Sequence, residues 1–196
     1  MNLKANLQEM EQNGIDLDPQ TVMTGINDTL AGAQLKWTDQ EMQQVLQRFA
    51  QEMQQKAMQR MQRQASKNQQ DADAFLARNG KQEGVQTTQS GLQFRIIQQG
   101  PDGPSPTISD RVKCNYKGTL LNGTEFDSSA KHGGPAEFPV NQVIPGWTEA
   151  LQKMRVGDKW QLYVPPKLAY GERSPGPPIE PNSLLVYDIE LVEILK

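Results

Sequence analysis

Apolar residues in the first part of the chain recur every three or four positions, which is the spacing of one helical face. Residues 3–10 and 22–30 both show this pattern, and each run ends before a glycine. Asp18 precedes Pro19, a pair typical of an N-cap followed by proline at the first helical position. The pattern predicts two short helices before residue 33.

A third and much longer helix is predicted from Thr38 onward. Thr38 and Glu41 have the spacing of a capping box, and no proline or glycine follows until Gly80. A helix of roughly 40 residues would be about 60 Å long. Its apolar stripe covers residues 42–53 and fades beyond Met61, so we expect the first part to pack against a partner and the second part to stand in water.

The N-terminal helices alone would enclose only a thin core. Packing against a second copy of the chain would supply the missing burial, so the pattern predicts a homodimer through residues 1–55. The glutamine-rich composition of this part could instead indicate disorder, but the capping box and the long run of helix formers argue against that.

The second half alternates apolar and polar residues with the period of strands. Strands are expected around residues 92–96, 112–116, 124–126, 160–164 and 184–195, with a two-residue hairpin turn at Asn122-Gly123. A short amphipathic helix is expected over residues 147–154. We therefore predict a helical dimerisation domain at 1–82, with a stalk helix at about 39–79, and an α+β domain at 83–196 in which an antiparallel sheet wraps one helix.

Composition excludes several classes of function. The net charge of −3 gives no global attraction to nucleic acid, and no stretch is long and apolar enough to span a bilayer. A single cysteine excludes an internal disulfide and a multi-cysteine metal site, and we expect no cofactor and no metal. Cys114 lies in an alternating segment and is interpreted as a buried strand residue, with a reactive thiol as the alternative.

The N-terminal residues lack a charged segment followed by an apolar one, so no signal peptide is predicted in this sequence. Two compartments stay open. The protein would be periplasmic or associated with the outer membrane of a Gram-negative bacterium if a signal peptide was removed, and cytoplasmic otherwise.

Three short motifs indicate the chemistry. Residues 143–147 place an apolar pair and a tryptophan at the start of a short helix, residues 169–172 add a tyrosine, and residues 126–129 add an acid beside an aromatic ring. Together they suit a water-poor aromatic pocket with few polar handles. Such a pocket favours binding and twisting of an apolar peptide segment over hydrolysis.

Six short motifs follow one another in the second half. They are Gly91-Leu92-Gln93-Phe94, Tyr116-Lys117-Gly118-Thr119-Leu120, Phe126-Asp127-Ser128-Ser129, Val143-Ile144-Pro145-Gly146-Trp147, Leu168-Ala169-Tyr170-Gly171 and Leu185-Val186-Tyr187-Asp188-Ile189-Glu190-Leu191. Their order is the one seen in FKBP-type peptidyl-prolyl cis-trans isomerases, which residues 84–196 resemble. Residues 14–18, 32–35 and 73–76 are similar to the dimerising domain and stalk helix of the macrophage infectivity potentiator (Mip) group.

The resemblance implies prolyl isomerase activity (EC 5.2.1.8) on proline-containing polypeptides, with macrolides such as rapamycin as inhibitors. It implies catalytic contributions from Asp127, Tyr170 and Trp147, with Trp147 as the floor of the pocket. The backbone N–H of Ile144 is implied as a further polar handle. The implied substrate-binding residues are Tyr116, Phe126, Val143, Ile144, Ile179 and Tyr187. Ile179 would lie on a loop that overhangs the pocket, whereas Trp160 is assigned to the core.

Two positions depart from the family pattern. Many members have an arginine where this chain has His132, and that arginine pairs with the acid, so the ion pair is left open here. Glu180 replaces the usual proline before Pro181 and adds a charge near the overhanging loop. A hydrolytic triad around His132 is disfavoured because the sequence has no nucleophile elbow.

Three functions are weighed. The first is a dimeric prolyl isomerase with chaperone-like action on unfolded or partly folded proteins. The second is a module that binds proline segments or macrolides with weak turnover. The third is a chaperone whose helical part itself binds clients.

Overall fold

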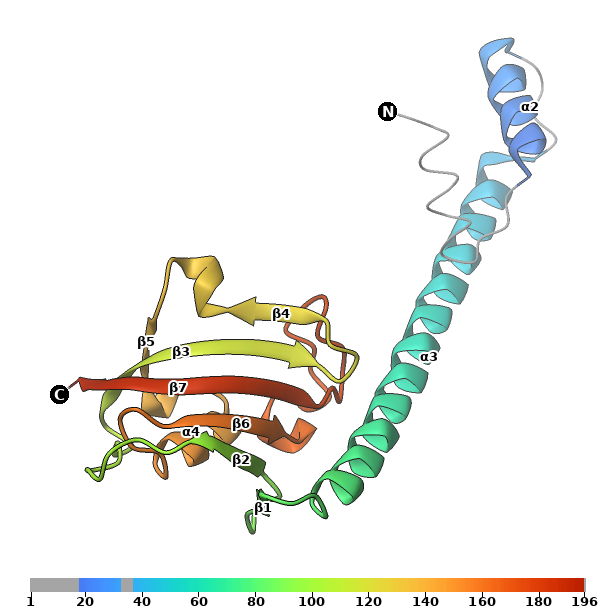
Figure 1. Ribbon diagram of the computed structural model, residues 1–196. Coiled ribbons are helices and arrows are strands. Elements are labelled where there is room, and N and C mark those ends of the chain that lie inside the picture. The colour runs from blue at the N-terminus through green and yellow to red at the C-terminus, as the bar shows by residue number, and fades with distance from the viewer. Residues whose placement is uncertain (1–17, 33–36, 196) are drawn as a thin grey trace. The chain divides into compact units, whose positions relative to one another are not determined.

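The computed structural model describes residues 18–32 and 37–195, which divide into two compact units at Lys56/Ala57. The helix expected over residues 3–10 lies outside the described residues. Among its described residues, the first unit contains α2 (Pro19–Leu30) and the beginning of α3 (Asp39–Asn79), as Figure 1 labels them. Within the described part of the chain, no helix is both long and apolar enough to cross a membrane. The predicted domain boundary at residue 82 stays a prediction.

Both helix starts follow the predicted local chemistry. The Asp18 carboxylate accepts hydrogen bonds from the backbone N–H groups of Gln20 (3.2 Å) and Thr21 (3.1 Å). At α3, the Thr38 N–H donates to Glu41 Oε2 (2.8 Å), and the Glu41 N–H donates to the Thr38 hydroxyl (3.3 Å). These bonds satisfy donors that have no partner inside the helix, so the N-cap and the capping box are confirmed.

The apolar stripe on the first half of α3 is not buried within one chain. Leu46 is 65% exposed, and Val45 and Phe49 are also exposed. An apolar stripe of this kind is normally covered by another element.

The second unit contains one antiparallel sheet. Its strands among the described residues are β1 (Val85–Thr87), β2 (Gln93–Gln98), β3 (Arg111–Leu120), β4 (Glu125–Ser128), β5 (Ala136–Pro139), β6 (Lys159–Val164) and β7 (Leu185–Leu195). They follow the order β1-β2-β6-β7-β3-β4, and β5 pairs with β3. Because β7 occupies one side of β3, strands β4 and β5 share its other edge, as Figure 1 shows.

Helix α4 (Pro145–Leu151) lies against one face of this sheet and closes the core. The core includes Leu151, Leu162, Leu185 and Trp160, all buried. Trp160 stacks on Phe94 with ring centroids 4.3 Å apart, so its assignment to the core is confirmed. The predicted α+β class, with a sheet wrapped on one short helix, is confirmed.

Cys114 is fully buried in β3, as predicted for a strand cysteine. Burial raises the pKa of its thiol to about 12. The thiol is therefore protonated near neutral pH and is a poor nucleophile.

The hairpin between β3 and β4 differs from the prediction. A two-residue type I′ turn needs positive φ at both central residues, but only Gly123 (φ 84°) has it among the residues of this turn. The Leu120 N–H donates to the Thr124 carbonyl (2.9 Å), so three residues form the loop. The prediction was also wrong in omitting β1 and β5, and α4 begins and ends earlier than expected.

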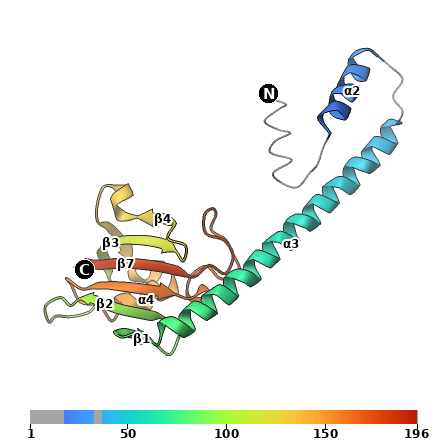
Figure 2. The ribbon, with the colours of Figure 1, turned by 45° about the vertical axis from the view of Figure 1, so that its right-hand side comes forward.

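The second half of α3 was expected to stand in water, and this expectation was wrong. Ala72 is fully buried, and the Phe75 ring lies 5.6 Å from the ring of Tyr163 on β6. The Asn79 amide donates to the Gln93 side chain (2.9 Å). Figure 2 shows this part of α3 running beside the sheet. The sequence signal is weak because a small residue and two polar side chains make much of this contact.

Candidate active site

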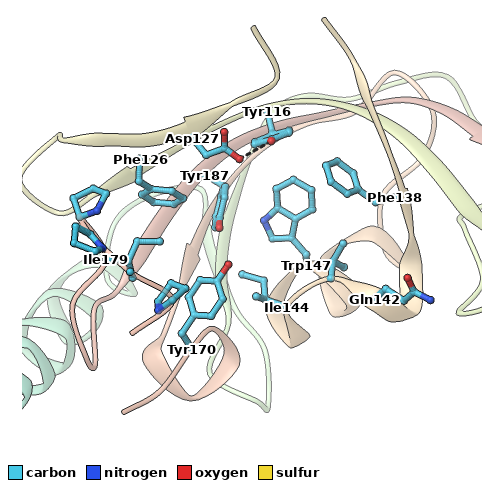
Figure 3. Close-up of a pocket in the computed structure, with 15 residues that line it drawn as sticks. Tyr116, Phe126, Asp127, Phe138, Gln142, Ile144, Trp147, Tyr170, Ile179 and Tyr187 are labelled. Carbon is cyan, nitrogen blue, oxygen red and sulfur yellow. Dashed lines mark hydrogen bonds between the residues drawn. The ribbon is translucent and has the colours of Figure 1, made fainter. Parts of the chain in front are cut away.

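One cavity of about 590 Å³ lies between α4, the sheet and the loop before β7. Every residue that the sequence analysis assigned to the pocket lines it (Figure 3). The full lining is Tyr116, Phe126, Asp127, Phe138, Gln142, Val143, Ile144, Trp147, Tyr170, Pro175, Gly176, Pro177, Pro178, Ile179 and Tyr187. The structure thus brings these residues together, while their individual roles stay predictions.

The floor is the Trp147 indole, which α4 presents toward the sheet. Rings surround it edge-on, with centroid distances of 5.1 Å to Tyr187, 5.3 Å to Tyr116 and 5.6 Å to Phe138. Such edge-to-face pairs are favourable beyond their buried area. In Figure 3 the indole lies between Tyr187 and Phe138. The floor and walls therefore hold one another in place before any ligand binds.

Gly118 on β3 makes this ring packing possible. A Cβ at this position would lie 2.5 Å from the Phe126 ring and 2.8 Å from the Tyr187 ring. Strand register places Gly118 directly beside Tyr187 on β7. Only a residue without a side chain lets both rings lie over the strand.

Asp127 is the one carboxylate among the residues that line the cavity. It accepts hydrogen bonds from the Tyr116 hydroxyl (2.7 Å), from His132 Nε2 (2.9 Å) and from the Ser128 backbone N–H (2.9 Å). Partial burial alone would raise the pKa of Asp127, but these hydrogen bonds outweigh burial and lower it. The group is ionised at neutral pH and fixed in direction.

His132 pairs with Asp127, a contact that the sequence left open. The 3-10 helix η1 (Ser129–His132) ends at Gly133, whose φ is 88°, and this turn brings the imidazole back to Asp127. His132 therefore pairs with the acid in this chain. Its side chain is 59% exposed, so the pair lies at the rim of the pocket.

Three donors at the cavity have no acceptor among the described residues. The Trp147 indole N–H is buried without a partner, and neither the Ile144 N–H nor the Tyr170 hydroxyl donates a hydrogen bond. A buried donor without a partner costs free energy unless a ligand or water satisfies it. These donors can therefore hold carbonyl oxygens of a bound peptide.

The hydroxyls of Tyr116 and Tyr187 remain protonated. Burial is the main reason that the pKa of each is raised, and the hydrogen bond to Asp127 adds to the effect at Tyr116.

No three potential metal-ligating side chains cluster in residues 18–32 and 37–195. The site therefore offers oriented donors, one fixed carboxylate and an aromatic box.

Sequence reasoning missed several lining residues. Phe138 lies on β5, and the alternation of Ala136, Phe138 and Val140 was a signal that could have revealed this strand. Gln142 carried no such signal. Pro175–Pro178 form the start of the overhanging loop, and their pocket role depends on how that loop folds back.

Comparisons with known proteins agree with this geometry. Residues 103–192 match the FKBP-type peptidyl-prolyl cis-trans isomerase family, and residues 3–96 match the domain amino terminal to FKBP-type peptidyl-prolyl isomerase. The "Outer membrane protein MIP" of Legionella longbeachae is 43% identical over 96% of this chain and 81% of its own length.

Two further relatives cover nearly the whole chain. The FKBP-type peptidyl-prolyl cis-trans isomerase FkpA of Aeromonas hydrophila is 44% identical over 97% of this chain and 70% of its own length. The crystal structure of FkpA from Escherichia coli matches with a TM-score of 0.85 and 39% identity, covering 98% of this chain and 89% of that chain.

The fold and the aromatic cavity define a prolyl isomerase of the FKBP class. The chain belongs to the FKBP-type peptidyl-prolyl cis-trans isomerase family, and the resemblance to the Mip group is confirmed. Its activity is acceleration of cis-trans exchange at Xaa-Pro peptide bonds.

Proposed function

We propose that the cavity over Trp147 is the site at which the chain isomerises Xaa-Pro bonds. The observation that supports this most is the joint placement of an indole floor, edge-on aromatic walls and unpaired donors around one fixed carboxylate. Such a site suits a proline ring with its preceding amide.

The physical task is to lower a rotational barrier. Amide resonance opposes rotation with about 18–20 kcal/mol, and uncatalysed exchange before proline takes tens of seconds or more. The twisted amide has lost resonance and is less dipolar than the planar one. An aromatic cavity therefore binds the twisted form better, relative to the planar form, than water does, which is differential binding of the transition state.

Each polar group then has a role. The Tyr170 hydroxyl and the Ile144 N–H hold substrate carbonyl oxygens, and Trp147 supports the proline ring. The Asp127 carboxylate acts electrostatically near the carbonyl carbon of the twisting bond. No proton transfer or nucleophile is needed, because only a rotation separates substrate from product.

The deciding experiment follows exchange of a short Xaa-Pro peptide by NMR with wild type and Asp127→Ala, with and without rapamycin. We expect rapid exchange in wild type, abolition by rapamycin and weaker exchange in the variant. Asp188→Ala is the matched control, because Asp188 is exposed on β7 and bonds Gln161 (2.9 Å) away from the cavity. Control activity should stay near wild type.

Two outcomes would contradict parts of this proposal. Exchange that Asp127→Ala and Asp188→Ala reduce equally would remove the assigned role of Asp127. Exchange that rapamycin leaves unchanged would remove the macrolide inhibition and place turnover outside the cavity.

We further propose a homodimer through residues 1–55 that gives the enzyme chaperone-like action. The exposed apolar residues of α2 and early α3 support it, because a second copy would cover them. Two pockets in one dimer would hold one unfolded chain at two points, and effective concentration would raise avidity. Sedimentation measures the assembly, and a refolding assay with truncation of residues 1–56 measures the chaperone action.

We also propose a compartment for this chain. One relative is named an outer membrane protein, which supports a periplasmic or outer-membrane-associated location for this chain. Fractionation of cells that express the full natural gene checks this, and recovery only in the cytoplasmic fraction would contradict it.

A further inference from the structure

Helix α3 contacts the overhanging loop of the cavity through polar groups. The Asn68 side-chain Nδ2 donates to the backbone carbonyl of Pro181 (2.9 Å) and lies 3.4 Å from Glu180 Oε2. In the reverse direction, Asn182 Nδ2 donates to the backbone carbonyl of Ala65 (3.4 Å). Both ribbon views show the loop beside this part of α3.

The Asn68 amide also contacts a second side chain, on its own helix. Gln64, one turn earlier on α3, donates from Nε2 to Asn68 Oδ1 (2.9 Å). Because the Gln64 amide could be assigned either way, the loop decides the orientation. The Pro181 carbonyl and the Glu180 carboxylate can only accept, so the Asn68 nitrogen faces the loop and its oxygen faces Gln64. A donor is required at this point, and an acceptor would be repelled.

The contacted loop segment leads directly to two walls of the cavity. Ile179 precedes Pro181 by two residues, is 8% exposed and lines the cavity. The Asn182 N–H donates to the Gly171 carbonyl (2.7 Å), and Gly171 follows Tyr170. A shift of residues 181–182 would therefore move both Ile179 and Tyr170.

Two further hydrogen bonds lie within the loop. The Ile179 N–H donates to the Gly176 carbonyl (3.0 Å), and the Ser174 hydroxyl donates to the Ile179 carbonyl. These bonds shape the loop internally, while the packing of Ile179 in the core and the Asn182–Gly171 bond attach it to the rest of the unit. The hydrogen bonds to Asn68 and Ala65 additionally attach the loop to helix α3.

We propose that Asn68 is a positioning residue for the isomerase, which holds the Ile179 and Tyr170 walls at the distance that the peptide needs. The inference rests on the proposed site at Trp147. Asn68 does not line the cavity, so its effect is on how tightly the peptide is held. Small displacements of positioning groups have large kinetic consequences.

The test uses the full chain and two changes at one position. Asn68→Asp keeps the shape but turns the donor into an anion facing the Pro181 carbonyl and the Glu180 carboxylate. Asn68→Ala only removes the donor. Gln70→Glu is the matched control, since it makes the same amide-to-acid change at an exposed position on the same helix.

Turnover of a succinyl-Ala-Leu-Pro-Phe anilide is measured as kcat and KM, together with amide hydrogen exchange at Asn182. For Asn68→Asp we expect KM to rise about three- to tenfold, as expected for loss of a hydrogen bond, with kcat nearly unchanged. Asn68→Ala should raise KM less. Exchange at the Asn182 amide should accelerate in both variants and stay at wild-type rate in Gln70→Glu.

A second-site variant separates positioning from general damage. Adding Glu180→Gln to Asn68→Asp removes the carboxylate repulsion and should recover part of the lost affinity, although Glu180→Gln alone changes KM little. A helix that was simply destabilised would not be rescued in this way.

The proposal is overturned if both Asn68 variants match Gln70→Glu in KM and in Asn182 exchange. A fall in kcat at unchanged KM would also overturn it, because Asn68 would then act on bond rotation and not on substrate placement. These outcomes are separable from failure of the site itself, which shows as unchanged turnover in Asp127→Ala.

Discussion

The two compact units differ in where their apolar side chains lie. In the unit from Ala57 onward, large residues such as Leu151, Leu162 and Trp147 are buried around α4. In the described residues of the first unit no side chain of α2 is buried, and Leu30 and Leu46 are 81% and 65% exposed. The second unit buries its large apolar side chains in a core, whereas the described residues of the first unit leave theirs exposed.

Helix α3, which has 41 residues, combines a half whose apolar side chains are exposed with a half that packs against other elements. Its first half carries a regular apolar stripe that is exposed within the chain. Its second half lacks a stripe, yet Ala72 is buried and Asn68 and Asn79 bond to neighbouring elements. The comparison teaches that an apolar stripe indicates a need for a partner, while its absence does not indicate that a helix is free.

The largest effect is expected from a charge placed in the exposed apolar stripe of α3. Phe49→Glu places a charge where we propose that a second copy packs, and burial of an unpaired charge is strongly unfavourable. We expect dimer dissociation to become at least about 100-fold easier, on the basis of a few kcal/mol per unpaired charge. Analytical ultracentrifugation measures this.

Gln51→Glu is the control for Phe49→Glu, because it adds the same charge at an exposed position of the same helix without removing an apolar ring. Peptide isomerisation should be unchanged in both variants, since the cavity lies wholly in the other unit. An unaltered sedimentation coefficient for Phe49→Glu would exclude the stripe as the dimer interface.

A smaller effect is expected from the same Gly→Ala change in each unit. Gly118→Ala would drive a methyl group into the Phe126 and Tyr187 rings, whereas a Cβ at Gly25 in α2 meets no atom within 4 Å. Overpacking costs about 1–3 kcal/mol, so urea unfolding should show that loss for Gly118→Ala. Its kcat/KM should fall about tenfold because the walls move.

Gly25→Ala should leave unfolding unchanged or stabilise slightly, since alanine is the better helix former. Equal losses from the two substitutions would show that the units are packed alike, contrary to the comparison.

The smallest effect is expected for the Asp127–His132 pair, which lies at the rim of the cavity in the second unit. Both side chains are partly exposed, at 40% and 59%, and exposed pairs contribute about 0.2–1 kcal/mol. A double-mutant cycle of Asp127→Asn and His132→Asn, read by urea unfolding, should give a coupling in that range. A coupling indistinguishable from zero would mean that His132 does not order the acid.

The pH dependence of Asp127 has a definite sign. Its folded-state pKa is lowered, so the stability contributed by its ionised form is fully present above the unfolded value, for which 3.8 is the ordinary figure. In a His132→Asn background, which removes the titration of the paired imidazole, the effect of Asp127→Asn on the unfolding free energy should stay constant from pH 8 to 5. It should shrink only as pH falls through the folded pKa, and a change near pH 6 would contradict this assignment.

Much of the fold was predictable because local chemistry specified it. The cap at Asp18, the capping box at Thr38 and the alternation in β3 each depend on a few neighbouring residues, and each was confirmed. The second half of α3 was not predictable, because its contacts pair Asn68 with Pro181 and Phe75 with Tyr163 across long sequence separations. No periodic apolar signal accompanies them.

The sequence by itself determined the starts of α2 and α3, the strand faces, the family and most of the aromatic pocket residues, because these depend on local hydrogen bonding, side-chain period and motif order. Only the tertiary structure decided that His132 reaches Asp127, that Phe138 joins the aromatic wall and that Asn68 contacts the overhanging loop. These features depend on distances between segments remote in sequence. Such distances arise when strand register and core packing place the segments side by side.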